Sequence, residues 1–75
     1  LIKINDWFRI ITVPEINNRV KEIFEDQRGI VLEYFEIANE ATLKETDFFY
    51  KGHYYRAFIV VFVGEVRLID NMHLD

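Results

Sequence analysis

The chain has 75 residues, the size of one small domain, and 51% of them are hydrophobic, which is typical of a globular protein rather than a disordered segment. Its net charge of −4, with nine basic residues scattered among thirteen acidic ones, disfavours binding to nucleic acid or to an anionic membrane surface. Cysteine is absent, which excludes disulfides and thiolate metal sites, and the longest apolar run, 57–63, is too short to cross a bilayer.

Two helices are predicted at the start of the chain. Residues 1–11 form a short amphipathic helix, because apolar side chains recur at the spacing of one helical face: Ile4, Trp7, Phe8 and Ile11. The second helix begins after Thr12, whose hydroxyl can accept from the amide of Glu15 while the Glu15 carboxylate reaches back, as in a capping box. Gly29 is expected to end this helix in a left-handed conformation. Its apolar stripe consists of Ile16, Val20, Ile23 and Phe24.

Residues 30–37 are predicted to form the first strand. In strict alternation its apolar side chains occupy both faces, with Ile30, Leu32 and Tyr34 on one and Val31, Phe35 and Ile37 on the other. We therefore expect a strand that is covered on both sides. Residues 39–46 are predicted to begin with a turn or with a short helix capped by Asn39. Residues 47–55 form an aromatic, irregular segment with a turn at Gly52.

The last two predicted strands are residues 56–63 and 66–71. Between them Gly64-Glu65 suits a two-residue type II′ hairpin turn, because glycine stands at its first position. This turn sets the register and opposes Val63 to Val66, Phe62 to Arg67, Ile59 to Asp70, and Phe58 to Asn71. The order helix, helix, strand, turn, strand, strand predicts an α+β domain, in which a small three-stranded antiparallel sheet packs with helices.

Three stretches carry a family resemblance: residues 64–71, residues 32–37 followed by Thr42-Leu43, and residues 12–15. The first, Gly-Glu-Val-Arg-Leu-Ile-Asp-Asn, resembles the C-terminal signature of pantothenate synthetases (pantoate–β-alanine ligases), which usually reads Gly-Lys-Thr-Arg-Leu-Ile-Asp-Asn. The other two resemble the family's strand with its Thr-Leu turn and the start of its helix, in the same order and at similar spacing. Glu65 and Val66 depart from the usual Lys-Thr, which removes a positive charge from the turn.

The resemblance implies that residues 1–75 are the C-terminal lid domain of an enzyme that condenses pantoate with β-alanine. Such enzymes use ATP and magnesium, pass through a pantoyl adenylate, and act in the cytoplasm. Their nucleotide motifs lie in an N-terminal nucleotidyltransferase domain, which also forms the homodimer, and neither motif occurs in this chain. We therefore expect the chain alone to be inactive, to hold no catalytic, cofactor-binding or metal residue, and to have that domain as its partner, without nucleic acid or membrane.

Arg67, Asp70 and Asn71 are the candidate site residues, because they are polar side chains within the signature. They either contact the rest of the enzyme or hold the hairpin and its neighbours together. Alternation places Arg67 and Asn71 on one face of the sheet and Asp70 on the other, so Arg67 and Asp70 are not expected to pair with each other. Each then needs its own partner if it is buried.

Other candidates are weaker. His53 and His73 with Asp70 or Asp75 have no ligand spacing that indicates a metal site. The aromatic residues in 48–55 either fill the core or form an exposed docking surface. Apart from the resemblance, the alternative function is a stand-alone α+β interaction module.

Overall fold

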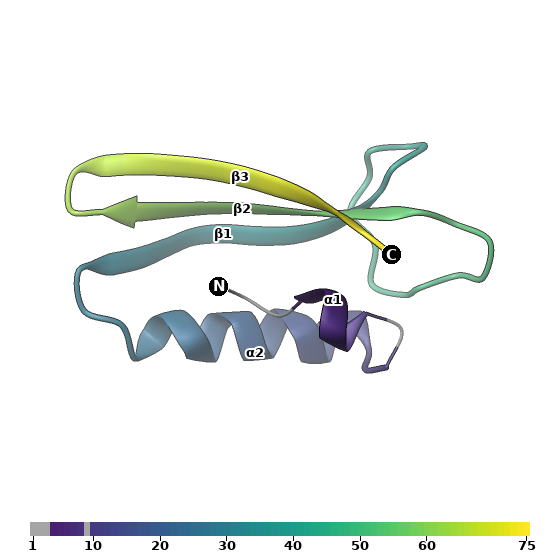
Figure 1. Ribbon diagram of the computed structural model, residues 1–75, viewed down its shortest axis with the longest axis horizontal. Helices are drawn as coiled ribbons and strands as arrows, with labels where there is room; N and C mark the ends of the chain where they lie inside the picture. Colours follow the sequence, from purple (N-terminus) through teal and green to yellow (C-terminus); the bar gives the residue numbers. More distant parts are fainter. Residues whose placement is uncertain (1–3, 9) are drawn as a thin grey trace.

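The computed structural model describes residues 4–8 and 10–75 and confirms the predicted α+β fold class. Three antiparallel strands form one sheet in the order β1-β2-β3, with β1 spanning Ile30–Asn39, β2 Tyr55–Val63 and β3 Val66–Leu74. Helices α1 (Ile4–Trp7) and α2 (Val13–Glu25) lie on the same side of this sheet (Figure 1). We call the helix-covered side the inner face and the opposite side the outer face.

Helix α1 is shorter than the predicted helix over residues 1–11, of which residues 1–3 and 9 lie outside the described residues. It ends at Trp7, and the chain then turns through Ile10, which is 76% exposed. Apolar spacing predicts which side chains face the core, and Ile4 and Phe8 are indeed buried. That spacing does not reveal that the chain must turn before Thr12 to enter α2.

Helix α2 begins with the predicted capping box. The amide of Glu15 donates to Thr12 Oγ1 at 3.2 Å, and the amide of Thr12 donates to Glu15 Oε1 at 3.4 Å. The buried residues of the helix are Val13, Ile16, Val20 and Phe24, while Ile23 packs against the core from a partly buried position.

The predicted role of Gly29 as the end of this helix is wrong. The helix already ends at Glu25, with Asp26 as its C-cap in a right-handed conformation. Gly29 does have a left-handed φ of 80°, but it uses this conformation to enter β1. Its carbonyl accepts from the amide of Gly64 at 3.2 Å, so the two glycines tie the start of β1 to the hairpin turn.

Strand β1 contains an irregularity that changes its faces. The pairing with β2 shifts between Leu32 and Tyr34, which leaves Glu33 without a partner across the ladder. As a result the residues that pack on the inner face are Ile30, Leu32, Phe35 and Ile37. Tyr34 therefore shares the outer face with Val31, which corrects the alternation that was predicted through Glu33.

The expectation that β1 is covered on both faces is also wrong for the described chain. Val31 is 63% exposed and Tyr34 is 41% exposed, because the helices cover only the inner face. Phe58 and Phe62 of β2 share the outer face and are partly buried, whereas Val60 between them is buried.

The hairpin of β2 and β3 has the predicted register in all four pairs, from Val63 opposite Val66 to Phe58 opposite Asn71. Gly64 has a φ of 61°, and the φ of Glu65 is not positive. A type II′ turn requires a positive φ at its first central position only, so both residues agree with the predicted turn type. Both strands are longer than predicted: β2 begins at Tyr55 and β3 continues to Leu74, and both of these residues are buried.

The segment between β1 and β2 begins with the predicted turn and forms no helix within residues 40–46. The Asn39 side-chain oxygen accepts from the amides of Ala41 and Thr42 at 2.8 and 3.3 Å. The aromatic residues that follow divide between two roles. Phe49 packs edge-on against Phe8 and Tyr55 in the core, at ring distances of 4.7 and 5.1 Å. The exposed ones are Phe48, Tyr50 and Tyr54.

Candidate interface site

The three candidate residues of the signature lie on β3 and face opposite sides of the sheet, as the alternation predicts. Arg67 stands opposite Phe62, and Asn71 stands opposite Phe58, on the outer face. Asp70 stands opposite Ile59, whose side chain packs toward the inner-face core. Their predicted contact with the rest of the enzyme stays a prediction.

Arg67 forms a salt bridge with Glu33, a residue that the sequence analysis does not name as a candidate. Its Nε and Nη2 donate to Glu33 Oε2 at 3.0 and 2.7 Å, across the intervening strand β2. The hydrogen bond and the charge of Glu33 raise the pKa of Arg67 above its ordinary value. The unpaired position of Glu33 at the β1 irregularity places its carboxylate within reach of β3.

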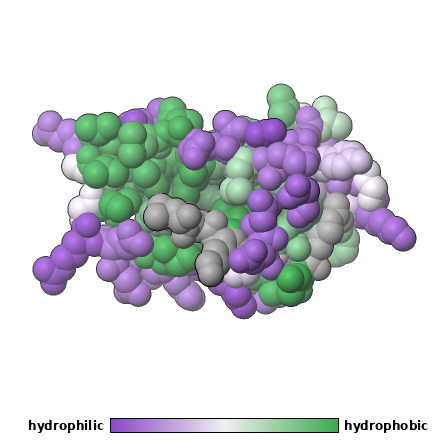
Figure 2. Space-filling view, viewed as in Figure 1, coloured by the Kyte–Doolittle hydropathy of each residue, from purple (hydrophilic) through white to green (hydrophobic). Residues whose placement is uncertain are grey.

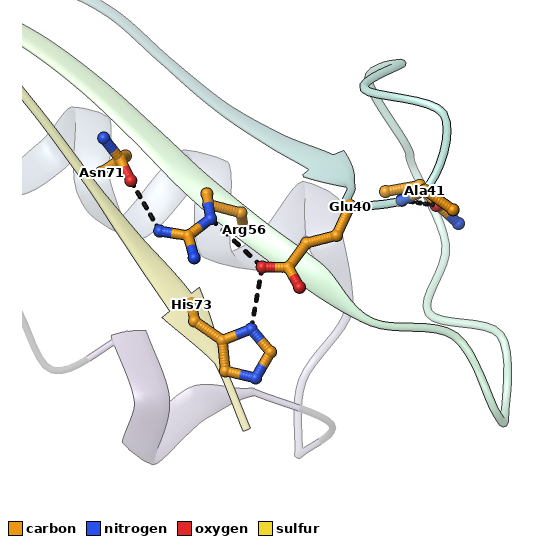
Figure 3. A network of polar contacts seen from close by, with 6 residues as sticks. Glu40, Ala41, Arg56, Asn71 and His73 are labelled. Carbon is orange, nitrogen blue, oxygen red and sulfur yellow. Dashed lines mark hydrogen bonds and ion pairs between the residues drawn. The ribbon is translucent and has the colours of Figure 1, made fainter.

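Asn71 belongs to a second polar cluster on the outer face, which Figure 3 shows from close by. Arg56 donates to Asn71 Oδ1 at 2.6 Å through Nη1 and to Glu40 Oε2 at 3.1 Å through Nε. His73 Nδ1 lies 2.8 Å from the same Glu40 oxygen. The hydrogen bond from His73 is the main cause that lowers the pKa of Glu40 below its ordinary value, and the charges of His73 and Arg56 act in the same direction.

This cluster could be found in the sequence only in part. The hairpin register alone places Arg56 directly opposite His73. Glu40 joins them only because β1 pairs with β2 in a register that places Ala38 opposite Arg56, and that register depends on the irregularity at Glu33. We recognise no sequence pattern that predicts the irregularity at Glu33.

Asp70 is in a different environment from Arg67 and Asn71. One carboxylate oxygen accepts from the amide of Asn71 at 2.8 Å. Among the described residues no salt bridge includes Asp70, whereas Arg67 and Arg56 each have a carboxylate partner. Asp70 is thus an acidic side chain on the inner side of the sheet with no cationic partner among the described residues.

A groove of about 430 Å³ lies beside Asp70 on the inner face. Ile59 and Val61 of β2 line it with Leu68 and Met72 of β3, and Ile4 and Phe24 line it from the helical side. Figure 2 shows apolar side chains gathered over the end of the sheet where β2 and β3 are joined, which is where this groove opens. The groove exists because α2 packs mainly against β1, so that the described residues leave the inner face of β2 and β3 uncovered toward the hairpin turn, whereas Tyr55, Ala57 and Leu74 at the other end are buried.

The described residues contain no group of three or more His, Asp or Glu side chains that could hold a metal ion. The two histidines are in separate settings, since His53 Nδ1 lies 3.0 Å from Asn39 Nδ2 and His73 contacts Glu40. Neither described helix is long and apolar enough to span a membrane.

The class that the fold and the site define is a small α+β unit whose described residues leave an apolar groove on one face of the sheet. Comparison with known proteins shows the family to which it belongs. The family model for pantoate-beta-alanine ligase matches residues 3–73, nearly the whole chain. The chain belongs to the pantoate–β-alanine ligase family, as the three sequence stretches predict.

Curated relatives support this assignment. The pantothenate synthetase of Christiangramia forsetii is 39% identical over 71 residues, which are 95% of this chain and 25% of that protein. The enzyme of Flavobacterium psychrophilum is 47% identical over 60 residues, 80% of this chain and 21% of the relative. That of Bacteroides thetaiotaomicron is 46% identical over 61 residues, 81% and 22% respectively. The chain thus spans about a quarter of the length of the relatives it matches.

Proposed function

We propose that these residues act as the C-terminal lid domain of an ATP-dependent pantoate–β-alanine ligase. The observation that carries the proposal is the match over residues 3–73 combined with a span of only 21–25% of the relatives' length. A match that covers only a quarter of each relative supports a role in completing a site housed in the remaining three quarters.

In the proposed reaction, the carboxylate of pantoate attacks the α-phosphorus of ATP, and pyrophosphate leaves. The amine of β-alanine then attacks the acyl carbon of the pantoyl adenylate, and AMP leaves. ATP, magnesium and both substrates bind in the remainder of the enzyme, which also forms its dimer, and the enzyme acts in the cytoplasm. The lid excludes water from the adenylate, which would otherwise hydrolyse, and helps to hold the reactants in place.

This proposal is tested with a chimera in which residues 1–75 replace the matched quarter of the Flavobacterium psychrophilum synthetase. The covalent link keeps the effective concentration of the lid high. Pantothenate formation from pantoate, β-alanine and ATP is compared with that of the natural relative and of the same relative with its matched quarter deleted.

We expect the chimera to form pantothenate well above the deleted form, and the 75-residue chain alone to form none. A chimera that is folded but no more active than the deleted form would contradict the proposal. That result would favour the alternative, a separate interaction module, whose exposed apolar groove and aromatic residues Phe48, Tyr50 and Tyr54 would then serve another protein.

A further inference from the structure

Among the described residues, apolar side chains are exposed on both faces of the sheet, and the polar groups of the two faces differ. On the outer face both arginines are paired with carboxylates across the strands, Arg67 with Glu33 and Arg56 with Glu40. The cationic side chains of this face thus already have partners within the chain, although Glu36, opposite Phe58, forms no salt bridge among the described residues. Among the described residues, the inner-face groove has an acid at its edge, Asp70, without a cationic partner.

The groove is also concave, and its floor consists of side chains that a core would normally cover. Leu68 is 49% exposed, and Val63 and Val66 next to it are exposed as well. These residues continue the same inner face that α2 covers over β1. A contiguous apolar patch with a polar group at its rim is typical of an interaction surface rather than of a solvated one.

Charge and apolar area together define what fits this surface. The occupant must bring apolar side chains into the groove beside Leu68 and Met72, and a basic side chain to Asp70. A carboxylate at the rim of an apolar groove loses hydration when it is covered, so it requires a charged or hydrogen-bonding partner in the complex.

We propose that the inner-face groove is the docking surface for the remainder of the synthetase, and that Asp70 pairs there with a lysine or arginine of that remainder. This inference rests on the proposed function, because the occupant is the three quarters of the enzyme that the relatives carry beyond the matched part. The outer face then stays in solvent.

The test uses hydrogen exchange on the chimera described above and on the 75-residue chain. The described residues of the chain leave the groove uncovered, so docking in the chimera is expected to add protection to the backbone amides of β3 and of the adjoining part of β2. Leu68→Ser removes an apolar contact in the groove, and Asp70→Asn removes the charge. Ile69→Ser is the matched control, because Ile69 is the neighbouring residue on the outer face and is 67% exposed.

Burying one apolar side chain changes an equilibrium by about tenfold or more, so Leu68→Ser is expected to reduce the added protection by about tenfold. Asp70→Asn is expected to reduce it by a similar or larger factor, because it leaves the partner's charge unpaired. Ile69→Ser should leave the added protection unchanged. All three substituted residues are exposed in the chain alone, so thermal unfolding of the 75-residue variants should remain close to that of the parent chain.

The two proposals fail in different readouts. An active chimera with no added protection at β3, or with equal losses in Leu68→Ser and Ile69→Ser, overturns the groove and leaves the proposed function standing. Loss of protection in Leu68→Ser without any loss in Asp70→Asn overturns the role of Asp70 as a partner. An inactive, folded chimera overturns the proposed function itself, whichever face is protected.

Discussion

At the scale of single residues, Glu40 connects stability to pH. Its pKa lies below the ordinary value of 4.5, chiefly because His73 donates a hydrogen bond to it and because His73 and Arg56 are close. A carboxyl whose pKa is lowered on folding stabilises the folded chain above its unfolded-state pKa, and this contribution is lost as pH falls through the folded-state pKa. The Glu40 cluster therefore stabilises the sheet at neutral pH and ceases to do so in acid.

Glu40→Gln tests this dependence, because glutamine retains the size of the side chain and removes its charge. We expect the parent chain to exceed the variant in free energy of unfolding above pH 4.5, and the difference to shrink as the pH is lowered below that value. Urea unfolding of both proteins across a pH series measures the difference, in which the other acidic groups cancel. A difference that does not vary with pH would contradict the assignment of the lowered pKa to Glu40.

Whether a residue contact could be predicted from the sequence depends on how the partners are connected. The Thr12–Glu15 capping box was predictable, since both partners lie in one turn of helix and its geometry is local. The contact of His73 with Glu40 joins residues 33 positions apart. It depends on two strand registers, of which the sequence specified only the hairpin. The same reason explains why Glu33 was missed as the partner of Arg67.

At the scale of elements, the β2–β3 hairpin depends on one glycine. Gly64 has a φ of 61°, and a Cβ added there would meet no atom within 4 Å, so the cost of a side chain at this position comes from the backbone alone. Gly64→Ala should therefore destabilise the chain by about 1 kcal/mol, the usual cost of a left-handed residue with a Cβ.

Glu65→Ala is the matched control for that substitution, because Glu65 occupies the next turn position without a positive φ and is exposed. It should change the free energy of unfolding little. Chemical denaturation of both variants decides the matter. Equal effects from the two substitutions would mean that the turn does not depend on the conformation of Gly64.

Some elements of the fold can be predicted from sequence patterns and others cannot. The hairpin was predicted with its register because a two-residue turn fixes all later pairs. The predicted faces of β1 are wrong beyond Leu32. Strict alternation of side chains assumes a regular strand at Glu33, whereas the pairing shift there moves each later side chain to the opposite face. The expected cover on both faces of β1 was a reasonable consequence of apolar residues on both sides, but this chain supplies helices for one side only.

At the scale of the whole molecule, the chain is more open than a compact protein of its mass. Its accessible surface is 5520 Å², whereas a folded monomer of 9.1 kDa is expected to expose about 4,900 Å². Its radius of gyration is 12.5 Å, against about 11.4 Å for a compact domain of this length. The excess surface is comparable to the lower range of interfaces between domains of one chain. This supports a domain that buries further surface within a larger enzyme.

The same openness predicts how backbone protection is distributed in the chain alone. Strand β2 is paired on both sides, so each of its amides has a strand partner, whereas β3 is paired with β2 only. In a two-residue hairpin the residues flanking the turn exchange both hydrogen bonds, and the pattern then alternates along the strand. The amides of Leu68, Asp70 and Met72 therefore face β2, while those of Arg67 and Ile69 face away from it.

Hydrogen exchange followed residue by residue should thus alternate along β3. Leu68, Asp70 and Met72 are expected to exchange slowly, and Arg67 and Ile69 fast. The amide of Asn71 should be slower than these two, because it donates to the Asp70 carboxylate. Asp70→Ala should raise the exchange rate at Asn71 without changing the rate at Ile69. Uniformly slow exchange along β3 would mean that its free edge is paired with another strand, as in a dimer of this chain through β3. That result would contradict a monomer in which this edge is exposed.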